Sequence, residues 1–133
     1  MFGSFDVSTS ALVAQRTRLE AISANIANQH SIEDAQGNYM PFKKRMVIFA
    51  HGDPSTGNKN GVHVREIRQV DAFKKVYRPG HKFADAQGYV KMPDIDSTMQ
   101  HVSALEARRA YEANITAIET TKAMISASLR ILS

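Results

Sequence analysis

Residues 111–132, with the sequence YEANITAIETTKAMISASLRIL, carry the pattern that decides the fold. Apolar side chains recur in this stretch every four and then every three residues, and only one lysine interrupts the series. The positions are Tyr111, Ile115, Ile118, Lys122, Ile125, Leu129 and Leu132. A 4-3 spacing held over three heptads is typical of a helix that packs on another helix along one narrow stripe.

The start of this helix is marked around residue 96. Pro93 is the last helix breaker, because residues 94–133 contain neither Gly nor Pro. Asp96 or Ser97 is a candidate N-cap, and Gln100 follows Ser97 at the spacing of a capping box. We therefore predict a helix from about residue 97 to 132, which is about 50 Å long. A rod of that length cannot bury its stripe within so small a chain, so we expect it to need further helices, including those of other subunits.

A second apolar stripe lies near the N-terminus. Its members are Phe5, Leu12, Leu19, Ile22 and Ile26, four of them at spacings of seven. The pattern predicts a helix from about Ser4 or Ser8 to about Asn28, with the hydroxyl residues at positions 8–10 as candidate N-caps. Because the chain leaves and returns to one insert, we expect residues 1–36 and 94–133 to form an antiparallel coiled-coil-like pair, one core domain.

The insert between the helices, residues 37–93, has the composition of β structure. It holds all four Pro, six of the seven Gly and seven of the ten aromatic residues. Strand-like residues 43–51 and 61–71 flank a turn-forming stretch, which predicts a β-hairpin. The alternation slips between Val64 and Ile67, which predicts either a bulge or burial on both faces of the strand. Shorter strands are expected at 73–77 and 89–92. The predicted class is α+β, mainly helical, with a hairpin-rich insert.

Positive charge is concentrated in this insert. Residues 43–91 have a net charge of +7, whereas residues 1–42 and 92–133 have −2 and −1. The candidate contact residues are Lys43, Lys44, Arg45, Lys74 and Lys75. We favour contacts with protein at these positions. The alternative is a basic dimeric module that binds nucleic acid or another polyanion, because aromatic residues lie beside the lysines.

Residues typical of catalysis or cofactor binding are missing. The chain has no Cys and no phosphate-binding, zinc-protease or nucleophile-elbow motif, so we predict no enzyme, no cofactor, no metal and no small-molecule substrate. His51 and His63 could face each other across the hairpin, but no third ligand accompanies them. Asp94 and Asp96 are better explained by the helix start than by acid–base chemistry. No apolar run is long enough to span a membrane, and the first residues lack the features of a signal peptide.

Three motifs carry a resemblance to a known family. Residues 23–28, SANIAN, resemble the S-x-N-[IL]-A-N signature of bacterial flagellar rod and hook proteins. Residues 84–96, ADAQGYVKMPDID, are similar to the A-D-x-x-G-Y-V-x-M-P-x-[VI]-D segment of the proximal-rod family. The YEAN of 111–114 and the TKAM of 121–124 resemble the closing helix of the same family.

The resemblance implies a structural subunit of the periplasm-spanning rod of the flagellar basal body. Such a subunit is exported through the flagellar type III apparatus without a cleaved signal peptide, and its terminal helices build a tube that transmits torque and encloses the export channel. The implied partners are further copies of the chain and the rod proteins FlgB, FlgF, FlgG and FliE, with no nucleic acid. The expected assembly interface comprises Phe5, Leu12, Leu19, Ile22, Asn25, Ile26, Asn28, Tyr111, Asn114, Ile115, Ile118, Ile125, Leu129 and Leu132.

Overall fold

Two helices and two antiparallel strand pairs make up the computed structural model, which describes residues 2–55 and 57–133. The elements are α1 (Phe2–Ala27), β1 (Lys44–Asp53), β2 (Asn58–Val70), β3 (Phe73–Tyr77), β4 (Tyr89–Pro93) and α2 (Ser97–Leu132). Met1 and Thr56, which fall in the predicted core domain and in the predicted hairpin turn, lie outside the described residues. The predicted α+β class is confirmed, and the helices hold nearly half of the chain.

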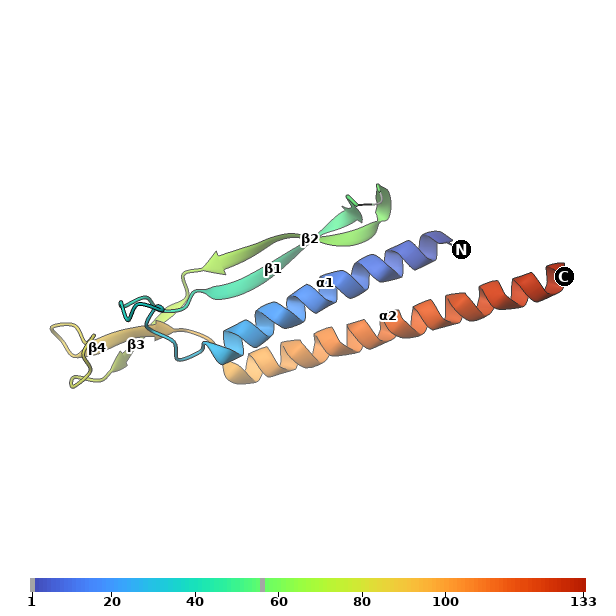
Figure 1. Ribbon diagram of the computed structural model, residues 1–133. Helices are drawn as coiled ribbons and strands as arrows, with labels where there is room; N and C mark the ends of the chain where they lie inside the picture. The colour runs from blue at the N-terminus through green and yellow to red at the C-terminus, as the bar shows by residue number, and fades with distance from the viewer. Residues whose placement is uncertain (1, 56) are drawn as a thin grey trace.

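Helix α1 is the middle layer of an elongated molecule (Figure 1). The β1–β2 hairpin runs along one side of α1, and α2 runs antiparallel to α1 along the other. The β3–β4 pair extends from the end at which α1 stops and α2 begins, while both termini lie at the opposite end. The predicted antiparallel helix pair is therefore confirmed, with the hairpin added as a third layer.

The predicted start of α2 is confirmed at Asp96. Its side chain accepts hydrogen bonds from the backbone N–H groups of Thr98 at 2.9 Å and Met99 at 3.3 Å, as an N-cap does. The capping box is wrong, because Gln100 is buried and its side chain accepts a hydrogen bond from α1 instead. The N-caps expected at residues 8–10 are also wrong, since α1 begins at Phe2 and these residues lie within the helix.

Small side chains form the centre of the packed layers. Ala14 and Ala21 of α1 and Ala107 of α2 are buried, together with Ile22. Because α1 has neighbours on two sides, alanine at these positions lets the layers approach closely. A separate buried cluster at the β4 end comprises Val90, Met92 and Ile95. The larger residues of the predicted N-terminal stripe, such as Leu12 and Leu19, are only half-buried.

The hairpin contains the predicted bulge. Ile48 lies opposite Glu66, but Phe49 lies opposite Val64, so Arg65 is the extra residue on β2. The bulge falls between Val64 and Ile67, where the apolar alternation slips. A bulge increases the local twist of a strand pair. The hairpin contacts α1 at two places, through Arg45 of β1 and through Val62 of β2.

One of these places is Ser10. Its hydroxyl donates to the carbonyl of Val7 at 2.8 Å and accepts from the N–H of Val62 in β2 at 3.1 Å. Gly61, next to Val62, is buried, and a Cβ atom at Gly61 would lie only 3.0 Å from Ser10 Oγ. Glycine at this position therefore allows the hairpin to approach α1 closely enough for the hydrogen bond.

We predict that Ser10→Ala weakens docking of the hairpin on α1. The N–H of Val62 would lose its partner at a part-buried site, which costs about 1–2 kcal/mol. Chemical denaturation of the full chain measures the loss, with Ser8→Ala as the matched control two residues away in the same helix. Equal stability of the two variants would contradict the role assigned to Ser10.

Candidate assembly interface

The predicted interface residues divide into three groups by exposure. Ile22 and Asn25 are buried inside the chain, which leaves them no free surface for another subunit. Most of the others are half-buried, namely Phe5, Leu12, Leu19, Ile26, Asn28, Tyr111, Asn114, Ile118 and Ile125. Ile115, Leu129 and Leu132 are exposed. The exposed members therefore gather toward the C-terminal end of α2.

Helix α2 extends beyond α1 at this end of the molecule. It has 36 residues and α1 has 26, which correspond to about 54 Å and 39 Å. Ala117 and Thr121 border the same hollow as Gly3 and Ser4, at the start of α1. Residues 123–132, which we call the C-terminal extension, continue past that point (Figure 1). Leu129, Ile131 and Leu132 in this extension are 62%, 85% and 84% exposed.

A second stripe on α2 was missed in the sequence. Starting from residue 113, small or apolar side chains again follow a 4-3 spacing, and all of them are exposed. They are Ala113, Ala117, Thr120, Met124, Ala127 and Ile131. The signal was present as a second heptad series, shifted by two residues from the first. Because its members are mostly alanine and threonine, it is inconspicuous beside the isoleucines of the first stripe.

Asn25 joins three elements of the fold. Its side-chain oxygen accepts from the N–H of Arg45 at 2.8 Å, and its amide nitrogen donates to the carbonyl of Arg45 at 2.9 Å. The same nitrogen donates to Oε1 of Gln100 at 3.2 Å. The side chain is 1% exposed, so α1, β1 and α2 meet at a buried amide. Asn25 therefore acts within the chain, and its effect on assembly is indirect.

The other two asparagines make local hydrogen bonds. Asn28 donates to the carbonyl of Ala24 at 2.8 Å and accepts from the hydroxyl of Ser31 at 3.1 Å, which shapes the chain as it leaves α1. Asn114 donates to the carbonyl of Ala110 at 2.9 Å within α2. Both side chains remain half-buried.

The basic residues of the insert have different surroundings. Lys43 pairs with Asp71 at 3.3 Å, and the guanidinium of Arg45 lies 5.5 Å from the centre of the Phe42 ring. Lys44 is half-buried. Lys74 and Lys75 are exposed on β3, and neither has an acidic partner among residues 2–55 and 57–133. These two lysines are thus the most available for contact with another molecule.

Neither histidine of the hairpin forms part of a metal centre in the described part of the chain. His51 lies opposite Val62 and His63 opposite Ala50, so the two rings do not face each other directly. Nδ1 of His63 is hydrogen-bonded to the carbonyl of Gly52 at 2.8 Å. Over residues 2–55 and 57–133, the structure places no group of three or more potential ligands around a metal position. No helix within those residues has the length and apolar character that a membrane span needs.

Comparison with known proteins relates both ends of the chain, and the chain as a whole, to one family. The family described as "Flagella basal body rod protein" matches residues 5–29, which cover most of α1, and "Flagellar basal body rod FlgEFG protein C-terminal" matches residues 86–131, which cover β4 and α2. The flagellar basal-body rod protein FlgC of Bacillus subtilis is 37% identical over 98% of this chain and 97% of its own length. FlgC of Salmonella typhimurium is 37% identical over 96% and 94% of the two chains, and that of Aquifex aeolicus is 36% identical over 92% and 90%.

The chain belongs to the FlgC family. It is a structural subunit of the flagellar basal-body rod, as the resemblance in the sequence implied. FlgC-family membership places it in the basal body, among other rod and basal-body proteins, and the family is not known to be enzymatic. The alternative of a nucleic-acid-binding module gains no support from these relatives.

We predict that Asn25→Ala destabilises the FlgC-family fold more than alanine at any other position in residues 23–28. It would leave both backbone groups of Arg45 and the Gln100 side chain without their partner, at a cost of about 3 kcal/mol. Denaturation of the full chain measures this loss. Asn28→Ala is the matched control, because it removes only local hydrogen bonds and should cost less than half as much.

Proposed function

We propose that this chain builds the proximal rod by packing its terminal helices against the helices of neighbouring subunits. The observation that carries the proposal is the C-terminal extension of α2, which continues beyond the start of α1 and leaves Leu129, Ile131 and Leu132 exposed. Burying a leucine or isoleucine completely gains about 1.5–3 kcal/mol. Three such residues in the extension provide a substantial driving force for association, even after the entropy of association is subtracted.

The two stripes of α2 give the helix two faces for contact. In the first stripe Tyr111, Ile118 and Ile125 are half-buried, whereas Ile115, Leu129 and Leu132 are exposed. The second, from Ala113 to Ile131, is exposed throughout and lined by small residues, which permit a close approach of a neighbouring helix. On this proposal, residues 1–36 and 94–133 form the assembly core around the export channel, and residues 37–93 face outward. A tube with helices packed on both faces is suited to transmitting torque.

The neighbours in this proposal are further copies of the chain and the rod proteins FlgB, FlgF, FlgG and FliE. The chain would reach them through the flagellar type III export apparatus, without removal of a signal peptide. The absence of cysteine suits passage between a reducing and an oxidising compartment. Exposed apolar stripes also suit a subunit that gains its final contacts only when it meets the growing rod.

We predict that the double change Leu129→Ser and Leu132→Ser abolishes rod assembly and leaves the free subunit intact. Both side chains are exposed in the single chain, so its unfolding free energy should change by less than about 0.5 kcal/mol. Assembly is measured by counting completed rods in basal bodies isolated from cells that make only the variant. The matched control, Leu129→Met with Leu132→Met, keeps the apolar surface and should assemble. Normal rods with the serine variant would refute the proposed interface.

We further predict that Lys74→Gln with Lys75→Gln slows assembly without weakening the finished rod. Exposed charges mainly steer encounter and fix orientation, and they add little to affinity. The measurement is the time course of rod appearance after induced expression, followed by dissociation of isolated rods in increasing salt. Tight, salt-sensitive binding of the unassembled wild-type chain to DNA would instead favour the polyanion-binding alternative.

A further inference from the structure

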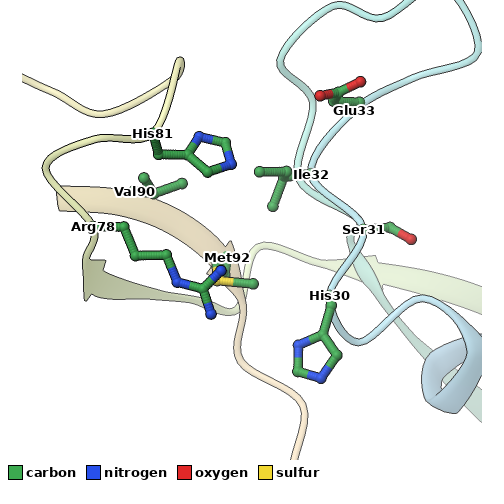
Figure 2. A pocket seen from close by; sticks show the side chains of 8 residues that line it. All are labelled: His30, Ser31, Ile32, Glu33, Arg78, His81, Val90 and Met92. Carbon is green, nitrogen blue, oxygen red and sulfur yellow. The ribbon is translucent and has the colours of Figure 1, made fainter.

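A groove of about 620 Å³ opens at the end of the molecule opposite the two termini. One wall is the segment that follows α1, and the other is the loop after β3 (Figure 2). Buried Val90 and Met92 of β4, with Ile32, make its base apolar. Its polar lining residues are His30, Ser31, Glu33, Arg78 and His81.

The two walls are fixed to each other and to β4. The hydroxyl of Tyr39 donates to the carbonyl of Lys91 at 2.8 Å and accepts from the N–H of the same residue at 2.9 Å. The Tyr39 ring stacks on Phe83 with 5.0 Å between ring centres. Lys82 pairs with Glu33 at 2.8 Å across the walls. These contacts form within one chain, so the groove exists before any partner arrives.

The groove offers hydrogen-bond donors without a matching acceptor. Arg78 has no acidic partner among residues 2–55 and 57–133. Nδ1 of His81 accepts from the N–H of Phe83 at 3.1 Å, which leaves Nε2 as the donor of that ring. Glu33 is the acid on the wall, but it is paired with Lys82.

The donors and the apolar base define the chemistry of a ligand that would fit this groove. A guanidinium binds a carboxylate through two parallel hydrogen bonds, and an apolar base favours an aliphatic group beside that carboxylate. A side chain of Glu or Asp next to aliphatic residues has both features. A nucleic-acid phosphate would match the donors but would leave the apolar base without a partner.

We infer that this groove binds a glutamate on α2 of a second copy of the chain, an inference that rests on the proposed function. Glu112 and Glu119 lie one heptad apart on α2, are exposed, and have no cationic partner within residues 2–55 and 57–133. Each has an aliphatic neighbour, Ala113 or Ile118. Of the three acids on α2, Glu106 pairs with Arg18, so Glu112 and Glu119 are the two whose charge can complement that of Arg78 in the groove.

The decisive experiment is a charge exchange in the rod itself. Arg78→Glu should lower the number of completed rods in isolated basal bodies at least tenfold, and adding either Glu112→Arg or Glu119→Arg to the same chain should restore them. Arg65→Glu, an exposed charge reversal on β2, is the matched control and should assemble. Thermal unfolding of each purified variant checks that the fold is kept. Normal assembly of Arg78→Glu, or failure of both second changes to restore it, overturns the inference.

A binding measurement on the free subunit tests the groove independently of rod assembly. The probe is 4-methylpentanoate, and its neutral analogue 4-methylpentanamide is the control. Saturable shifts of the His30 and His81 ring signals in NMR spectra are expected with the carboxylate, at least tenfold weaker in Arg78→Gln. Equal binding of the amide would overturn the inference. Normal assembly of the Leu129→Ser, Leu132→Ser variant would contradict the proposed function. Normal assembly of Arg78→Glu would contradict only the glutamate-binding groove, so the two failures can be told apart.

Discussion

The buried side chain of Asn25 is the interaction on which the arrangement of the layers depends. One amide satisfies the N–H and the C=O of Arg45 and also an oxygen of Gln100, so it must supply a donor and an acceptor in fixed positions. Aspartate lacks the donor and leucine lacks both. Because an unpaired buried amide is costly, the hairpin can dock on α1 only in the register that brings Arg45 to this residue. The S-x-N-[IL]-A-N signature thus has a physical reason at its third position.

A helix held between two neighbours has to be narrow, and this explains the distribution of side chains on α1. Ala14 and Ala21 are buried, while Leu12 and Leu19 are only half-buried. Ser10 fixes the hairpin at one place along α1 and Asn25 at another, 15 residues or about 22 Å along the helix. Because these polar contacts set the register of the hairpin on α1, the half-buried Leu12 and Leu19 keep apolar surface for contacts with other subunits.

The parts of the structure that follow from local pattern could be predicted, and the parts that depend on distant polar pairs could not. The bounds of α2, the hairpin and the bulge at Arg65 follow from periodicity, helix breakers and one slip in alternation. The roles of Ser10 and Gln100 were mistaken, because an N-cap and a capping box are local explanations for residues whose true partners lie 52 and 75 positions away. The groove around Arg78 also escaped prediction, since it joins segments that are held together by contacts between distant residues, such as the Tyr39 hydrogen bonds to β4.

The mismatch in length between the two helices links the fold of one subunit to the growth of a filament. On the proposed function, an α1 as long as α2 would run beside the C-terminal extension, and association would lose part of its driving force. The uncovered extension lies at one end of an elongated molecule and the basic β3–β4 end lies at the other, so the contacts we propose between copies join different surfaces. Such heterologous contacts repeat without closing unless the rotation between copies returns to its start, and they generate helical filaments. A subunit whose two ends are unlike in shape and charge is therefore built for extension along an axis, which a symmetric dimer of the same helices would prevent.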